Sequence, residues 1–222
     1  MATVLSGYTH RDEMASAVKE ALTSVFDFKS VDGYDLYITD DIHLTLGTNG
    51  DMVINKGTLT YTIPYNNYGN YDWKVIKSES GDVAFRVGTA ENTYLADGQG
   101  LGMIITKVKD ALTDESGWGV FVPQSLLVQS VRYLITDDVA QLIDNSGRYS
   151  QGTTDAAAKY AVWNGNAKIS HLIPAAAVCS QCVSENLRVI DFGPREYFDD
   201  CTIKGKAYYS LGQVVMLDES EN

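Results

Sequence analysis

The residues with the clearest chemical potential are three cysteines and a histidine near the C-terminus. Cys179 and Cys182 form a CxxC pair, Cys201 follows it, and His171 precedes it. Zinc takes four thiolate or imidazole ligands in a tetrahedron, and a CxxC pair supplies two of them. The sequence has no second CxxC and no His pair, and free cysteines often fill small spaces in a core. We therefore expect structural cysteines, with a Cys3His metal site and a redox pair as alternatives.

The other residues that could support catalysis are dispersed. None of the histidines (His10, His43 and His171) has Ser, Asp or Glu at the spacing of a known triad motif. The acidic doublets fit turns and helix caps better than metal or glycosidase sites; they are Asp40/Asp41, Asp137/Asp138 and Asp199/Asp200. The glycine-rich segment 97–102 lacks the GxGxxG spacing and the Walker lysine. We expect no catalytic residue, no cofactor, no metal and no enzymatic activity.

An aromatic segment indicates recognition rather than catalysis. Residues 61–73 carry five aromatic side chains and three asparagines, the aromatics being Tyr61, Tyr65, Tyr68, Tyr71 and Trp73. Tyr contributes both contact area and a hydrogen bond at low entropy cost, which suits protein interfaces. Sugar-binding surfaces also combine aromatic faces with amide side chains. Three interpretations remain open: a subunit interface, a long loop packed on its own sheet, and a glycan-binding surface.

The elements that position these residues begin with an amphipathic helix. The pattern predicts a helix over 9–26, with Thr9 as its cap. Met14, Val18 and Leu22 fall on one face of this helix. A helix near a chain end packs either on its own domain or on a neighbour. We expect these three residues and the five aromatics to contact other subunits.

Runs rich in β-branched and aromatic residues predict strands in much of the remaining chain. Before residue 100 these are 36–39, 42–46, 52–54, 58–64, 73–77 and 83–87, with the last two forming a hairpin. Later strands are expected at 118–122, 169–173, 187–192, 202–204, 207–209 and 213–217, and helices at 101–112, 124–143 and 155–162.

The expected fold is therefore α+β, an antiparallel-β-rich single domain with an N-terminal amphipathic helix and two or three further helices. The domain covers 1–222, with a helical arm at 1–30, a β-rich extended part at 31–100 and a mixed α/β core at 101–222. No linker divides the chain.

Composition excludes several classes of function. The 222 residues include 17 basic and 29 acidic side chains, a net charge of −12. Proteins that grip phosphate backbones cluster Lys and Arg, so we expect no specific nucleic-acid binding. No apolar run approaches the roughly 20 residues that span a bilayer. The first residues lack the basic and apolar regions of a signal peptide, so synthesis in a reducing cytoplasm is expected.

The second half of the chain resembles tailed-phage major capsid proteins. The similar stretch is Gly119-Val-Phe-Val-Pro-Gln-Ser through Ile143, then Val162-Trp-Asn-Gly-Asn-Ala-Lys-Ile and Ile173-Pro. Residues 204–218 are similar to the closing strands of such proteins. The resemblance implies a self-assembling structural subunit of a bacteriophage virion, best matched by the capsid shell. Its implied partners are copies of itself and other virion proteins, and its implied final location is the virion.

Two alternatives accompany the capsid interpretation. Phage tail-tube, ring or connector proteins are the alternative within the virion, since tail-tube proteins are of similar length and β-rich with one helix. A negatively charged surface that repels passing DNA suits these proteins and a capsid shell equally. A β-rich glycan-binding module that uses the 61–73 segment is the alternative outside the structural class.

Overall fold

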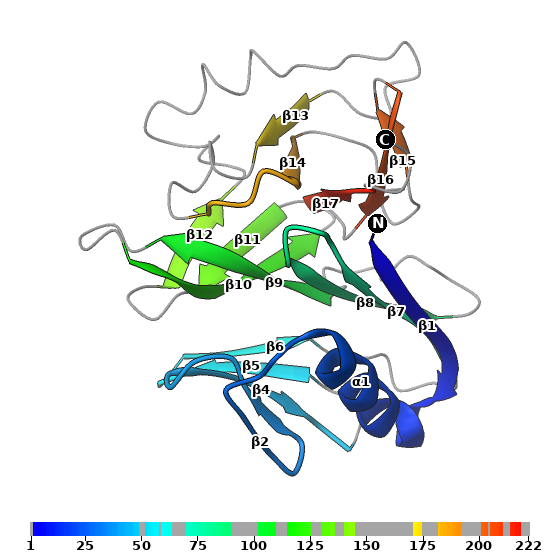
Figure 1. Ribbon diagram of the computed structural model, residues 1–222. Coiled ribbons are helices and arrows are strands. Elements are labelled where there is room, and N and C mark those ends of the chain that lie inside the picture. Colours follow the sequence, from blue (N-terminus) through cyan, green and yellow to red (C-terminus); the bar gives the residue numbers. More distant parts are fainter. Residues whose placement is uncertain are drawn as a thin grey trace.

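Three antiparallel sheets and one helix make up the described part of the computed structural model (Figure 1). The structure describes residues 2–48, 52–57, 59–63, 70–89, 102–109, 115–125, 130–135, 140–144, 171–174, 182–191, 201–203, 205–210 and 214–218. Within these residues the helix is α1 (Arg11–Val25). The antiparallel, β-rich character expected from the sequence is confirmed.

The central layer is a seven-stranded sheet, here called sheet A. Its order is β1 (Thr3–His10), β7 (Asn70–Lys77), β8 (Val83–Thr89), β9 (Gly102–Lys109), β10 (Ser116–Ser125), β11 (Ser130–Ile135) and β12 (Ala140–Asp144). The first strand of the chain therefore pairs with the seventh, and the following strands form a meander from it.

Two five-stranded sheets lie on either side of sheet A (Figure 1). Sheet B has the order β2 (Ser30–Asp32), β3 (Asp35–Tyr37), β4 (Ile42–Leu46), β5 (Met52–Lys56) and β6 (Leu59–Ile63). Sheet C has the order β13 (His171–Pro174), β14 (Leu187–Asp191), β17 (Val214–Leu217), β16 (Lys206–Ser210) and β15 (Cys201–Ile203).

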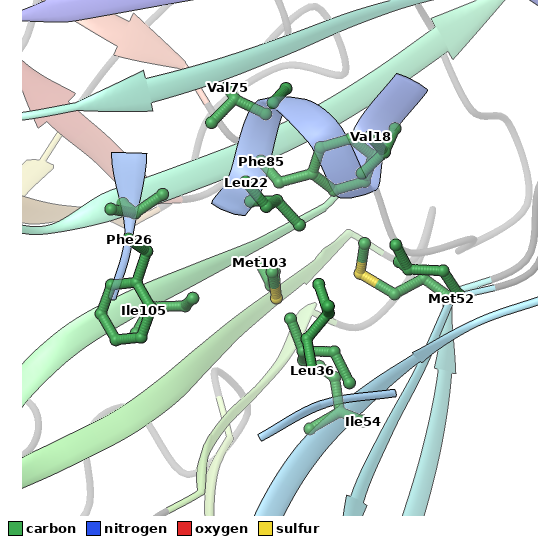
Figure 2. Packing of buried hydrophobic residues seen from close by; sticks show 14 of the residues in the cluster. Val18, Leu22, Phe26, Leu36, Met52, Ile54, Val75, Phe85, Met103 and Ile105 are labelled. Carbon is green, nitrogen blue, oxygen red and sulfur yellow. The ribbon is translucent and has the colours of Figure 1, made fainter. Parts of the chain in front are cut away.

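The main hydrophobic core lies between α1, sheet B and one face of sheet A (Figure 2). Alternation along each strand supplies it: Ile42, Leu44 and Leu46 of β4 point inward, and the residues between them are half-buried. From sheet A the core receives Phe85 and Met103, which are opposite each other on β8 and β9. Complete burial of each such side chain stabilises the fold by about 1.5–3 kcal/mol.

The opposite face of sheet A is also buried over its middle strands. Ile76, Ala84 and Ile104 lie in one row across β7, β8 and β9, and none of them is exposed to solvent. Leu187 and Met216, a cross-strand pair in sheet C, are equally buried. Sheet A is therefore a middle layer with apolar residues on both sides.

This double burial explains one wrong prediction, the helix at 101–112. The structure has β9 at Gly102–Lys109, with five consecutive buried residues at its start. A strand covered on both faces loses the alternation that marks a strand, and its sequence resembles that of a buried helix. Gly102 is required there, because a Cβ at this position would lie 1.7 Å from the carbonyl oxygen of Phe85.

The helix expected at 124–143 is also wrong in its described parts. Strand β10 continues to Ser125, and β11 and β12 occupy Ser130–Ile135 and Ala140–Asp144. Pairing with the neighbouring strand decided the conformation here, as strand preference depends strongly on tertiary context. The helix expected at 155–162 lies outside the described residues. The region 101–222 is thus not mixed α/β where it is described.

The N-terminal region differs from the expected arm in two ways. Residues 3–10 form β1, a strand missed from the sequence, and α1 begins directly after it. The helix cap is His10, whose Nδ1 accepts from the backbone N–H of Asp12, and not Thr9. The apolar face of α1 is in the main core, so the helix is an integral part of the fold.

Candidate functional site

The outer edge of β1 is the main candidate for a functional surface. Strand β1 pairs with β7 over its whole length, from Thr3 opposite Lys77 to His10 opposite Asn70. Among the described residues, no strand pairs with its other side, and β1 borders sheet A in Figure 1. No residue of β1 is buried, and Val4 and Tyr8 are 42% and 60% exposed. A free edge of this kind presents backbone N–H and C=O groups to another strand.

All the other sheet-edge strands in the described structure are shorter than β1, and some also carry a residue that opposes such pairing. Strands β2 and β15 have only three residues each. Strand β13 has four residues and ends with Pro174, which has no N–H to donate. Strands β6 and β12 have five residues each, and β12 ends with Asp144. Strand β1 is the longest of these edges, with eight residues, and like β6 it has no proline, lysine or acidic residue.

The inner face of β1 is anchored by Trp73. The indole of Trp73 lies directly against Gly7, where an added Cβ would be 2.5–2.8 Å from three of its ring atoms. The indole N–H donates to Thr9 Oγ1 at 2.9 Å. The lack of a side chain at Gly7 therefore lets the strand cover the ring, and β1 is held in position while its outer edge meets no described strand.

The helix residues expected at a subunit interface lie elsewhere. Met14, Val18 and Leu22 are at most 1% exposed and belong to the main core. Their apolar stripe is satisfied by sheets A and B of the same chain, so they have no surface to offer to a neighbour. The amphipathic pattern was correct, but it was wrong to assign that face to a partner.

The aromatic segment is divided by the structure. Tyr61 is part of β6, and Tyr65 and Tyr68 lie outside the described residues. Tyr71 and Trp73 are 1% and 9% exposed and point into the main core. For these last two residues the structure supports packing within the chain, and neither offers an aromatic face to a subunit or a glycan.

The cysteines and histidines do not form a cluster where they are described. Cys182 is buried, and its backbone forms an isolated bridge with Val108 of β9. Cys179 lies outside the described residues, and Cys201 and His171 are in β15 and β13. No group of three potential metal ligands occurs among the described residues.

His43 is part of a polar row on the outer face of sheet B. Its ring stacks on Tyr37 with centroids 4.8 Å apart. In the adjacent positions, Thr45 Oγ1 donates to Asp35 at 2.5 Å and accepts from the amide of Asn55 at 3.1 Å. Of the acidic doublets, Asp40 and Asp41 are in the turn before β4, where Asp40 pairs with Lys29; the other two doublets are outside the described residues.

A buried carboxylate, Asp82, was not singled out from the sequence. It is 1% exposed and lies immediately before β8, in the turn that joins β7 to β8. Thr106 of β9 donates to Oδ1 at 2.6 Å, and Ser80 and Ser184 donate to Oδ2 at 2.8 and 2.5 Å. A carboxylate has about four acceptor sites, and hydroxyl donors fill them well here.

This Asp82 cluster joins parts of the chain that are far apart in sequence. Ser184 follows Cys182 and Val183, and Val183 N–H donates to Lys107 O of β9 at 3.2 Å. The amide of Asn186 adds a hydrogen bond to Ser80 at 2.6 Å. The cluster therefore attaches the segment before β14 to sheet A. The sequence shows only a turn that contains Ser and Gly at this point. The partners Thr106 and Ser184 are 24 and 102 residues away from Asp82.

Comparisons with known proteins do not place the chain in a family. No family model, no curated protein and no solved structure matches it. In the described part of the chain, no helix has the length and apolar character needed to cross a membrane.

Proposed function

We propose that the protein is a self-assembling structural subunit of a bacteriophage virion. The observation that carries this proposal is the outer edge of β1, which pairs with no described strand, is long and regular, and lacks the residues that normally prevent strand addition. An edge of this kind in a stable protein is expected to be covered in the functional assembly. The resemblance of residues 204–218 to the closing strands of tailed-phage major capsid proteins, where the structure has β16 and β17, supports the kind of assembly.

Within the virion, the described architecture favours a tail-tube, ring or connector protein over a capsid shell. The capsid resemblance relied on a helix after Pro123, and the described residues there form β11 and β12 instead. A β-rich chain with its described helix near the N-terminus fits the alternative better. The net charge of −12 suits a component next to DNA that must not retain it.

The test is the mass distribution of the purified full chain, measured by light scattering over a concentration series and combined with negative-stain imaging. We expect species well above the 24.3 kDa of one chain, visible as rings or tubes. Closed shells would support the capsid alternative within the same proposal. A 24.3 kDa monomer at every concentration would contradict the proposal.

A further inference from the structure

We propose that β1 pairs antiparallel with β1 of a second copy of the chain, across a two-fold axis at Ser6. The pairing would join two copies of sheet A into one continuous sheet. This inference rests on the proposed self-assembly and specifies the surface and partner for one of its contacts. The argument uses the side-chain alternation of β1, the exposure of Val4 and Tyr8, and the space beside Gly7.

The alternation of β1 limits the available registers. Leu5, Gly7 and Thr9 are the less exposed positions, and the even-numbered residues between them are exposed. In an antiparallel pair, residues opposite each other point to the same face. In a two-fold pair of sheets, odd-numbered residues must therefore be opposite odd-numbered ones, so the numbers of each pair have an even sum.

One of these registers places the two exposed apolar side chains of β1 opposite each other. When the two residue numbers of each pair add up to 12, Val4 of one copy is opposite Tyr8 of the other, and this pair occurs twice. The two Ser6 residues then meet at the two-fold axis. Cross-strand pairs of an aromatic and a β-branched residue are among the favourable ones in sheets. A sum of 14 would place Val4 opposite His10, and a sum of 10 would place it opposite Ser6.

The inner face is also complementary in this register. Leu5 of one copy would be opposite Gly7 of the other, and Gly7 has no side chain to compete for the space. Leu5 already packs at the border of the main core, and the Trp73 indole lies beneath Gly7. Leu5 of the second copy would thus lie at the border of the main core of the first copy and lose its contact with solvent.

The opposite border of sheet A is the alternative partner for β1. Strand β12 has five residues and ends with Asp144, so it would leave part of β1 without a partner. Pairing of β1 with β12 is head-to-tail and would by itself produce rings or filaments, whereas the isologous pair needs a second contact of the chain to build them. Pairing of β1 with itself is isologous and matches all eight residues of the strand except His10, which would be opposite Ala2.

Disulfide trapping tests the register. In the Ser6→Cys variant, the two new thiols would be opposite each other at the axis, at a separation that a disulfide can bridge. We expect mild oxidation of the full chain to convert most of it to a covalent dimer on a non-reducing gel. The matched control is His10→Cys, an exposed position of the same strand that would be opposite Ala2 and far from its own equivalent in the second copy. Wild type oxidised in parallel reports the background from Cys179, Cys182 and Cys201.

A second pair of variants checks the same register independently of the axis. Val4→Cys and Tyr8→Cys should each remain monomeric on the gel when oxidised alone, and should form a covalent dimer when mixed. Equal cross-linking of Ser6→Cys and His10→Cys would overturn the inference, since it would indicate random encounters.

The outcomes separate this inference from the proposed function. If the wild type assembles but neither Ser6→Cys nor the mixture is cross-linked, the β1–β1 contact is wrong and self-assembly stands. If the wild type and Ser6→Cys are both monomeric at every concentration, both proposals fail. A Ser6→Lys variant places two like charges at the axis, and about fivefold weaker dimerisation is expected from it. Unchanged dimerisation of Ser6→Lys would also contradict the register.

Discussion

The middle strands of sheet A, β8 and β9, are buried on both faces, but the two faces are covered in different ways. One face meets α1 and sheet B in a continuous apolar core that includes Leu22, Phe85 and Met103. On the other face, a few apolar residues are accompanied by the Asp82 cluster, in which hydroxyl groups surround one buried carboxylate. The first face is stabilised by burial of area, which tolerates small displacements. The second depends on a few directional hydrogen bonds, which fix the position of the segment before β14.

The largest effect is expected on the apolar face, from Leu22→Ala. Leu22 is completely buried between α1 and the two sheets, so its truncation removes transfer free energy and leaves a cavity. The free energy of unfolding should fall by about 3–4 kcal/mol, measured by urea denaturation. The control is Glu20→Ala on the exposed side of the same helix, with a change below about 0.5 kcal/mol. If Leu22→Ala lowered the free energy of unfolding by no more than Glu20→Ala does, α1 would not be part of the core.

On the polar face, Asp82→Ala should destabilise the protein by about 2–3 kcal/mol, because several buried hydroxyls lose their acceptor. Asp82→Asn keeps one acceptor oxygen and should lower the free energy of unfolding by less than Asp82→Ala does. Hydrogen exchange should locate the change at residues 182–187 and β9, with less effect on α1. The matched control is Asp40→Ala, a carboxylate in an exposed ion pair with Lys29, where we expect little change. Uniform loss of protection over the whole chain would contradict a local role for the cluster.

At the edge of sheet A, Gly7→Ala should cost about 1–2 kcal/mol, because the new methyl group would overlap the Trp73 ring. Trp73 fluorescence should shift as the ring moves from its position. Ser6→Ala, on the exposed side of the same strand, is the control and should change stability by less than about 0.5 kcal/mol. Equal stability of the two variants would mean that β1 does not lie over Trp73.

The smallest effect is expected from Thr9→Val, which keeps the side-chain shape and removes the acceptor of the Trp73 N–H at 2.9 Å. A single neutral hydrogen bond contributes about 1 kcal/mol. Thermal unfolding should show a small decrease, and the exchange rate of the indole proton should increase. An unchanged indole exchange rate would show that this hydrogen bond does not hold the ring.

The sequence predicted β3 to β6 of sheet B and the β7–β8 hairpin, but not β2. In β4, buried residues alternate with half-buried His43 and Thr45, and the period of two is visible in the sequence. The same rule failed for β9, which is buried on both faces. It also missed β1, which pairs with β7 across 60 to 74 residues of sequence.

The candidate site was predicted less well than the fold. The expected interface residues Met14, Val18, Leu22, Tyr71 and Trp73 are core residues of the chain itself. An apolar stripe shows that a face needs a cover, and the sequence does not say whether the cover is the same chain or another one. The sequence did not indicate the edge of β1 as a site, because the strand itself had not been predicted. Its importance depends on the absence of residues that prevent strand addition, which can be judged only once the strand is known.

By itself the sequence determined the amphipathic pattern of α1, the β-rich class of the fold and the strong negative charge, since these depend on residue types and local spacing. Tertiary structure alone decided which strands border sheet A, that β8 and β9 are buried on both faces, and that Thr106 and Ser184 meet at Asp82. The physical reason is that strand pairing and buried hydrogen bonds join residues far apart along the chain. Local preference carries no information about such partners.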